Sequence, residues 1–377
     1  MRILIAPDSF KECMTAVEAA NAIARGVKRS LGDSVEIDLC PVADGGEGTL
    51  QVIAQSIPCT LHETTVTGPL GDPVKAAWLM SDNNCIAIIE SAQAIGLHLV
   101  PPAQRDPTRT TTYGVGQLIL AALNAGATRV IVSIGGTATI DGGCGMAQAL
   151  GVWFGDMVSE PIRGGELQQI DRVDRGEVDG RIVNTKFLVL CDVENELLGE
   201  KGAAVVFGPQ KGATATQIQS LEAGLTHLAS MIPDASPKFH MTGAAGGLAY
   251  GLDAFCRAPL VHGIFYILQI IRFDDRVRGC DLVITGEGRF DSQSLEGKAC
   301  AGVAACAKKH GVPTLLLAGS IQSPPLEGGD KGVGTHYFIG SHSIVGDLGI
   351  LPADAIRRGQ ELLEQLTTQT APKYLNP

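Results

Sequence analysis

The feature that most constrains this chain is a strand, a glycine-rich turn and a helix start that follow one another near the N-terminus. Residues 35–39 alternate between apolar and polar side chains, as a half-buried strand does. Gly45, Gly46 and Gly48 then allow a sharp turn, and an apolar-periodic segment begins at Leu50. Because the first amides of a helix have no partner within the helix, this arrangement predicts an anion-binding site.

Two carboxylates, Asp44 and Glu47, stand in the same turn. They would repel a bare phosphate, so a divalent cation would have to accompany any phosphate bound there. The alternative is an ordinary glycine-rich loop with solvated acids, and this turn alone does not separate the two interpretations.

The same chemistry recurs twice further along the chain. Residues 133–143 follow the apolar run 130–132, and residues 285–292 follow the apolar run 282–284. Ligands of open α/β sheets bind beyond the carboxyl ends of the strands, so the recurrence predicts one shared site for a polyanion. The candidate binding residues in these two segments are Gly135, Gly136, Thr137, Gly286, Gly288 and Arg289.

Composition narrows the class of protein. A chain of 377 residues is too long for one typical core, and its 47 glycines fit an α/β enzyme with many tight turns. The net charge of −11 argues against a nucleic-acid partner. No apolar run reaches the roughly 18 residues that a membrane span needs. Neither a signal-peptide layout nor zinc-like cysteine spacing is present, which predicts a cytoplasmic protein with reduced thiols.

The distribution of patterns along the chain predicts two domains. The N-terminal and C-terminal parts share a rhythm of strand, turn and helix, whereas the middle begins with a turn-linked antiparallel pair of strands. We therefore predict an α/β fold. A discontinuous Rossmann-like parallel-sheet domain, residues 1–65 and 281–377, carries an inserted second α/β domain, residues 66–280.

Local patterns place individual elements within this layout. Thr15 and Glu18 have the spacing of a capping box at the start of the first helix. Near the C-terminus, residues 337–339 are expected to form a strand and residues 354–369 the last helix.

The familiar nucleotide-binding motifs are incomplete. The pair Gly297–Lys298 lacks the first glycine and the final hydroxyl of a P-loop. The segment that contains Gly286 and Gly288 has Asp291 in place of the third glycine of a dinucleotide fingerprint. This argues against a nucleotide-dependent oxidoreductase.

A set of motifs nevertheless recurs in a fixed order. They occupy residues 7–11, 41–49, 67–71, 134–139, 141–143, 191–193, 207–213, 243–247, 284–289 and 291–293. In composition and order these motifs closely resemble bacterial class I glycerate kinases, from residue 3 to at least residue 320. The resemblance implies a two-domain α/β build and phosphorylation of D-glycerate by ATP with Mg²⁺. It also implies 2-phosphoglycerate as the expected product.

Three departures from the family pattern bear on the choice of substrate. Ile140 stands where asparagine is usual, Glu196 stands where proline is usual, and Gln93 interrupts a stretch rich in small residues. We expect Ile140 to be an exposed loop residue beside the ligand, so that Ile140→Asn would leave the fold intact. The reaction class is therefore better defined than the acid that is phosphorylated.

Phosphoryl transfer needs positioned phosphates, a metal ion and a carboxylate that orients the attacking hydroxyl. Asp192, which follows the apolar run 187–190, is the predicted base, and Lys11 is the predicted catalytic lysine. The remaining predictions are Ser9, Gly45, Gly46 and the six residues named above for substrate and nucleotide, and Asp44 and Asp291 for the metal. For each aspartate the alternative is a helix cap or a turn.

Other functions stay open on sequence alone. A kinase for another small hydroxy acid is the nearest alternative, and a non-catalytic ligand-binding regulator could use the same scaffold. The expected partners are glycerate and ATP, with neither nucleic acid nor membrane. The sequence leaves the oligomeric state open, a homo-oligomer included.

Overall fold

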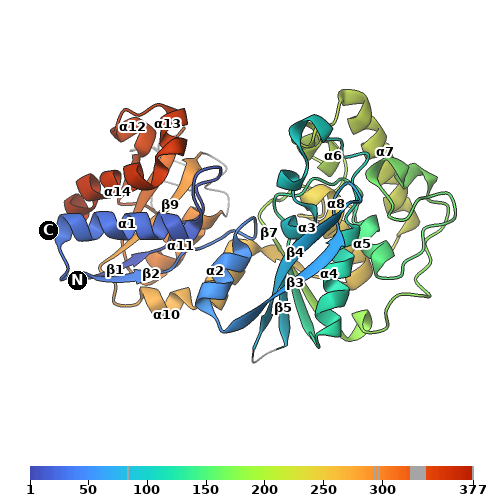
Figure 1. Cartoon of the computed structure of the whole chain (residues 1–377), viewed down its shortest axis with the longest axis horizontal. Coiled ribbons are helices and arrows are strands. Elements are labelled where there is room, and N and C mark those ends of the chain that lie inside the picture. The colour runs from blue at the N-terminus through green and yellow to red at the C-terminus, as the bar shows by residue number, and fades with distance from the viewer. Residues whose placement is uncertain (83–84, 292–293, 295–297, 323–336, 376–377) are drawn as a thin grey trace. The chain divides into compact units, whose positions relative to one another are not determined.

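The computed structural model divides the chain into two compact units. It describes residues 1–82, 85–291, 294, 298–322 and 337–375. Unit 1 comprises Met1–Asp44, Gln51–Ile57 and Ile264–Pro377, and unit 2 comprises Gly45–Leu50 and Pro58–Gly263. The darkest blue N-terminal segment, Met1–Asp44, and the red C-terminal segment therefore both belong to unit 1 (Figure 1).

Unit 1 is built on a five-stranded sheet in the order β11–β10–β9–β1–β2. Its strands are β1 (Arg2–Ile5), β2 (Glu36–Leu39), β9 (Leu282–Phe290), β10 (Thr314–Ile321) and β11 (Gly340–Ser343). Every neighbouring pair is parallel, which confirms the predicted parallel sheet. The order of the strands reverses between β1 and β9, and this reversal is the point where open α/β sheets bind ligands.

Helices cover this sheet. They are α1 (Ala16–Leu31), α9 (Gly263–Ile270), α10 (Phe273–Val277), α11 (Ala299–Lys309), α12 (Ile344–Asp347), α13 (Pro352–Arg357) and α14 (Gly359–Thr370), with part of α2 (Thr49–Ser56). The predicted capping box at α1 is confirmed, since Glu18 N donates to Thr15 Oγ1 at 3.2 Å and Thr15 N donates to Glu18 Oε2 at 2.8 Å.

Two expectations near the C-terminus are wrong. Residues 337–339 precede a strand instead of forming one, because β11 begins at Gly340. The expected single helix is two helices, α13 and α14, because Arg358 between them adopts a non-helical φ of −116°.

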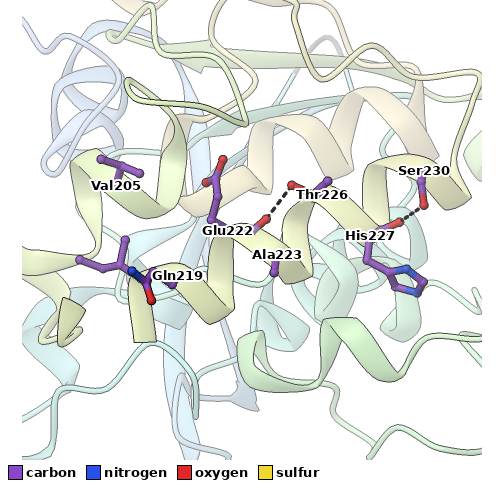
Figure 2. Close-up of a pocket in the computed structure, with 8 residues that line it drawn as sticks. Val205, Gln219, Glu222, Ala223, Thr226, His227 and Ser230 are labelled. Atoms are coloured by element: carbon purple, nitrogen blue, oxygen red, sulfur yellow. Dashed lines mark hydrogen bonds between the residues drawn. The ribbon is translucent and has the colours of Figure 1, made fainter. Parts of the chain in front are cut away.

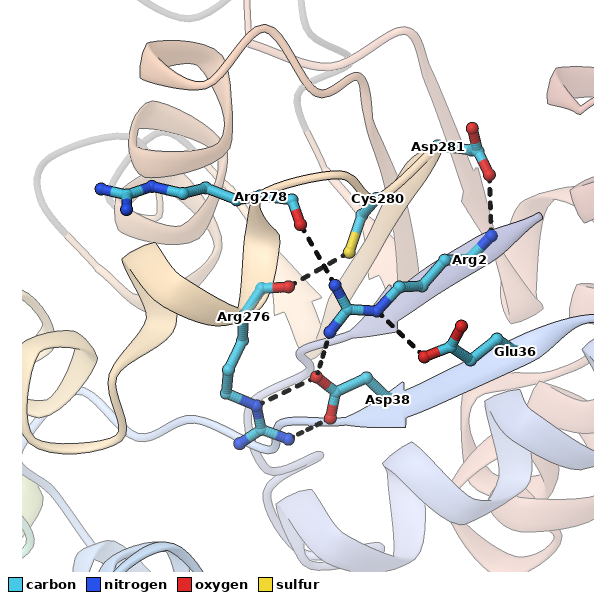
Figure 3. Close-up of polar contacts among 7 residues, drawn as sticks. All are labelled: Arg2, Glu36, Asp38, Arg276, Arg278, Cys280 and Asp281. Atoms are coloured by element: carbon cyan, nitrogen blue, oxygen red, sulfur yellow. Dashed lines mark hydrogen bonds and ion pairs between the residues drawn. The ribbon is translucent and has the colours of Figure 1, made fainter.

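An ion-pair cluster joins β1, β2 and α10 where β1 and β9 begin (Figure 3). Arg2 Nε lies 3.3 Å from Glu36 Oε1, and Arg2 Nη2 lies 3.3 Å from Asp38 Oδ2. The backbone N of Arg2 donates to Asp281 Oδ2 at 2.7 Å. The guanidinium of Arg276 in α10 binds both oxygens of Asp38. Arg2, Asp38 and Arg276 are half-buried, and their ion pairs attach α10 to the edge strand β2.

Unit 2 contains a six-stranded mixed sheet in the order β3–β4–β5–β6–β7–β8. The strands are β3 (Cys59–Thr67), β4 (Pro73–Ser81), β5 (Ile86–Glu90), β6 (Arg129–Ser133), β7 (Lys186–Cys191) and β8 (Leu260–His262). The predicted antiparallel hairpin is β3 with β4, and β5 to β8 are parallel. The main helices are α3 (Ala92–Ile95), α4 (Tyr113–Asn124), α5 (Cys144–Ala149), α6 (Ala203–Phe207), α7 (Ala215–Met231) and α8 (Ala244–Cys256).

The unit boundaries differ from the predicted domain boundaries. Residues 59–65 form most of β3 and pair with β4, so they belong to unit 2. Helix α10 and nearly all of α9 lie inside the predicted insert 66–280, yet they belong to unit 1. The chain also enters unit 2 once earlier, over Gly45–Leu50.

Candidate active site

In unit 2 the glycine-rich turn lies across the carboxyl ends of neighbouring parallel strands. A Cβ added to Gly135, which follows β6, would lie 2.6 Å from Gly46 Cα. A Cβ added to Gly45 would lie 3.1 Å from the Cβ of Leu190 in β7, and Gly45 has a φ of 101°. The structure thus brings together Gly45, Gly46 and Gly135, and close backbone approach is the reason for glycine here.

Glu90, the last residue of β5, holds the end of this turn. Its Oε1 accepts a hydrogen bond from Gly48 N at 3.3 Å, and its Oε2 accepts one from Leu50 N at 3.1 Å. Burial raises the pKa of the Glu90 carboxyl. The backbone amides of Gly48 and Leu50, at the start of α2, are therefore bound by the protein's own carboxylate. The expectation that they bind a substrate anion is wrong for Gly48 and Leu50.

A buried lysine supports the loop that follows β6. Lys211, only 3% exposed, donates from Nζ to Thr137 Oγ1 at 3.2 Å and to Thr139 O at 2.8 Å. Burial lowers the pKa of Lys211 to about 7, and nearby Asp141 opposes the shift. Sequence reasoning missed this residue, because most lysines are exposed and its only signal was a place in a glycine-rich motif.

Asp141 is a structural carboxylate. It is fully buried and accepts hydrogen bonds from Thr112 N, Thr112 Oγ1, Gly143 N and Gly145 N at 2.7–3.3 Å. Burial raises the pKa of Asp141. These bonds join the start of α4 to the start of α5.

The expectation that Ile140 is an exposed loop residue is wrong. Its side chain is 0% exposed and belongs to an apolar cluster that includes Cys144, Ala147 and Phe154. An apolar side chain suits this environment, and an asparagine there would bury an amide among apolar neighbours.

Asp192 lies where the sequence placed it. It directly follows Cys191, the last residue of β7, and is half-buried. Two residues further on, Glu194 Oε1 lies 2.9 Å from Nε2 of His262, the last residue of β8. Acidic side chains therefore gather at the carboxyl ends of β7 and β8.

In unit 1 three acids lie where the order of the strands reverses. Asp8 follows β1 and donates its backbone N to Gly286 O at 2.8 Å, Asp44 lies in the loop after β2, and Glu287 lies in β9. Burial raises the pKa of Asp8 well above its usual range, and the charges of Asp44 and Glu287 raise it further. Sequence reasoning did not select Asp8 or Glu287 because their burial is a tertiary effect.

Burial also raises the pKa of Glu287 to about 7, and the charge of Asp44 contributes to the rise. Glu287 Oε1 is buried and has no hydrogen-bond partner among the described residues. Crowded buried carboxylates with a free oxygen favour a bound cation.

The predicted turn at residues 285–292 is wrong as far as Phe290, because β9 continues through Gly286 and Gly288. A Cβ on Gly286 would lie 2.1 Å from Leu317 O, and one on Gly288 would lie 3.2 Å from Lys11 N. Glycine at these positions lets β10 and the Lys11 segment approach β9. Ser292 and Gln293 of the same motif lie outside the described residues.

The other predicted residues of unit 1 lie at the same end of the sheet. Ser9 N donates to Asp8 Oδ1 at 2.6 Å. The exposed Arg289 donates to Gln322 Oε1 at 2.5 Å, and its Nε lies 3.4 Å from Asp291 Oδ2. Ser9, Lys11, Arg289 and Asp291 thus lie on the loop after β1 or at the end of β9.

A surface groove lies beside α7 in unit 2 (Figure 2). Its lining residues are Val205, Ile218, Gln219, Glu222, Ala223, Thr226, His227 and Ser230. Thr226 and Ser230 each donate their hydroxyl to the carbonyl of a residue in their own helix. None of the predicted site residues lines the groove, so it is not assigned to the active site.

Glycines and acids gathered beyond the carboxyl ends of parallel strands are typical of α/β proteins that bind ligands at that end of the sheet. The model of the glycerate kinase family matches residues 3–374. The chain is 46% identical over 375 residues to a glycerate kinase from Halalkalibacterium halodurans, covering 98% of this chain and 97% of the relative. It therefore belongs to the glycerate kinase family, as the resemblance of its motifs indicated.

Two further comparisons agree. The chain is 44% identical over 330 residues to the glycerate 2-kinase of Escherichia coli K12, covering 85% of this chain and 86% of the relative. A crystal structure of a provisionally assigned glycerate kinase 2 from Salmonella typhimurium LT2 matches with a TM-score of 0.81 at 38% identity. It covers 99% of this chain and 98% of that one. The match confirms the mixed α/β fold.

Proposed function

We propose that the protein phosphorylates D-glycerate with ATP and Mg²⁺, and that the product is 2-phosphoglycerate. The observation that carries the proposal is the crowded acid site of Asp8, Asp44 and Glu287 in a member of the glycerate kinase family. The name of the Escherichia coli relative, glycerate 2-kinase, supports the position of the phosphate.

The donor set of unit 1 fits Mg²⁺. Carboxylate oxygens are the ligands that this ion prefers, and an ion there would pair with the unpartnered Glu287 Oε1. We propose Asp44 and Asp291 as metal-side acids, with Asp8 and Glu287 beside Asp44. When bound, the ion neutralises charge on the phosphates during transfer.

The remaining roles go to the predicted residues. Lys11 and Arg289 bind phosphate oxygens, with Ser9 and the glycines of β9 beside them. In unit 2, Gly45, Gly46, Gly135 and Gly136 present backbone amides, and Thr137 presents a hydroxyl oriented by Lys211. Asp192 orients the attacking hydroxyl of glycerate and accepts its proton.

The experiment is a turnover assay with a defined product. Purified protein is incubated with ATP, Mg²⁺ and D-glycerate, and phosphorus NMR separates 2-phosphoglycerate from 3-phosphoglycerate. We expect 2-phosphoglycerate, and no product when EDTA removes the metal. Product from another hydroxy acid alone would favour the nearest alternative, and glycerate binding without turnover would favour a regulator. Either result contradicts the proposal.

We also propose that the reaction takes place in the cytoplasm. All ten cysteines are free of disulfides, as reducing conditions would keep them. Within the described part of the chain, no helix is both long and apolar enough to cross a membrane. Cell fractionation with activity confined to a membrane or secreted fraction would contradict this assignment.

A further inference from the structure

A second group of metal-binding side chains lies in unit 1, apart from the acid site. Asp274 belongs to α10, Cys306 lies in the last turns of α11, and His310 is the residue that caps α11. Helix α11 starts beyond the carboxyl end of β9 and ends shortly before β10 begins. Its last turn therefore lies at the end of the sheet where the parallel strands begin, opposite the end where Asp8, Asp44 and Glu287 lie.

The three side chains converge on one point. His310 Nε2 lies 2.6 Å from Asp274 Oδ1, and Cys306 Sγ lies 3.2 Å from the same oxygen. One ligand atom from each residue lies within 4.8 Å of the ligand atoms of the other two. Cys306 and His310 are four residues apart, so one face of α11 presents both.

The chemistry of these ligands points to zinc. A thiolate, an imidazole and a carboxylate are all zinc ligands, whereas Mg²⁺ and Ca²⁺ prefer oxygen alone. Bond lengths of about 2.0–2.3 Å in a tetrahedron require ligand atoms to lie about 3.5 Å apart. The sulfur–oxygen separation of 3.2 Å is close to this value, and the nitrogen–oxygen separation of 2.6 Å must open by roughly an ångström.

The surroundings allow this adjustment. The Asp274 side chain is 61% exposed, so it can move and an ion can enter beside it, while Cys306 is buried beneath. The carboxyl end of α11 carries the negative end of the helix dipole, which favours a cation. Lys309 lies near enough to stabilise the charge of Asp274 and opposes a cation there.

We propose that Asp274, Cys306 and His310 bind one Zn²⁺ ion, with water as the fourth ligand, and that the ion fastens α10 to α11. Binding displaces the thiol proton of Cys306 to solvent and leaves the sulfur as a thiolate ligand. The site is separate from the proposed Mg²⁺ site and does not depend on the proposed function.

Cobalt provides a spectroscopic test on the full chain. After chelation and dialysis, the protein is titrated with Co²⁺ and then with Zn²⁺. We expect a thiolate-to-cobalt charge-transfer band and tetrahedral cobalt absorption that saturate at one equivalent. Zn²⁺ should abolish both signals, and excess Mg²⁺ should leave them unchanged. Absence of the charge-transfer band would overturn the proposal.

Three variants locate the site. Cys306→Ser should abolish the charge-transfer band, and the exposed Cys85→Ser, a matched control, should retain it. Asp274→Asn changes an exposed side chain and spares the core. It should weaken zinc binding by at least about a hundredfold. Loss of a hydrogen-bond partner of a metal ligand costs up to about a hundredfold in metal affinity, and Asp274 is itself a proposed ligand. A band that persists in Cys306→Ser, or zinc affinity unchanged in Asp274→Asn, would show that the cluster is only hydrogen-bonded.

Discussion

At the scale of single residues, burial decides which polar groups matter, and burial is what the sequence conceals. Asp192 and Lys11 could be selected because each follows an apolar run that ends at a ligand-binding edge. Glu90 and Glu287 also follow apolar runs, and Lys211 lies in a glycine-rich motif, but nothing in the sequence indicates the burial of these side chains. The segments that bury them come from elsewhere in the sequence.

Lys211 gives a prediction on the pH dependence of stability. Its pKa of about 7 lies below the usual 10.5, so between these values the unfolded chain binds a proton that the folded chain lacks. The contribution of Lys211 to the free energy of unfolding therefore rises with pH across this window, and it is lost as pH falls from about 10.5 to about 7. Lys211→Met should remove this rise.

Urea unfolding at several pH values from neutral to alkaline measures the effect. As pH rises, the unfolding free energy of wild type should increase relative to that of Lys211→Met. Lys186→Met, which removes an exposed lysine, serves as the control and should run parallel to wild type. Parallel curves for Lys211→Met as well would contradict the prediction.

Ile140 gives a prediction opposite to the one that its family position suggested. Because the side chain is fully buried, Ile140→Asn should lower the free energy of unfolding by about 2–5 kcal/mol. Ile140→Val should cost only about 0.5–1.5 kcal/mol. Denaturant titration of both variants measures this, and equal stability of the two would show that Ile140 is not a core residue.

At the scale of elements, helices and strands that are marked by a pattern within one segment were predicted well. The capping box of α1, the parallel strands of unit 1 and the hairpin of β3 with β4 all follow from local spacing. The segment 285–290 was misread as a turn, because glycine serves both turns and strands that another backbone approaches closely. Only the position of the neighbouring segment distinguishes the two cases.

Gly288 tests this explanation for β9. A Cβ there would lie 3.2 Å from Lys11 N and from Phe10 Cα, both backbone atoms that must shift. We expect Gly288→Ala to cost about 1–3 kcal/mol of stability, as overpacking does, and to lower turnover by displacing Lys11. Gly180→Ala meets no atom within 4 Å and is the control. Thermal unfolding and turnover of Gly288→Ala that match this control would contradict the explanation.

At the scale of the whole molecule, composition and the order of motifs predicted the class and the family. The division into units was predicted less closely, because the chain enters unit 2 for only Gly45–Leu50 before returning. So short an excursion has no signature in composition. It is held by Glu90 and by the approach of Gly46 to Gly135, which are contacts between segments distant in the sequence.

The central claim is that acids at the carboxyl ends of the parallel strands carry phosphoryl transfer to glycerate, with Asp192 as the base. The most direct test is the turnover number of Asp192→Asn with Mg²⁺, ATP and D-glycerate, measured beside its folding by circular dichroism. A general base contributes about 10²–10⁴-fold, so turnover should fall at least about a hundredfold while the KM for ATP stays near wild type. Normal turnover, or a variant that fails to fold, would contradict the claim.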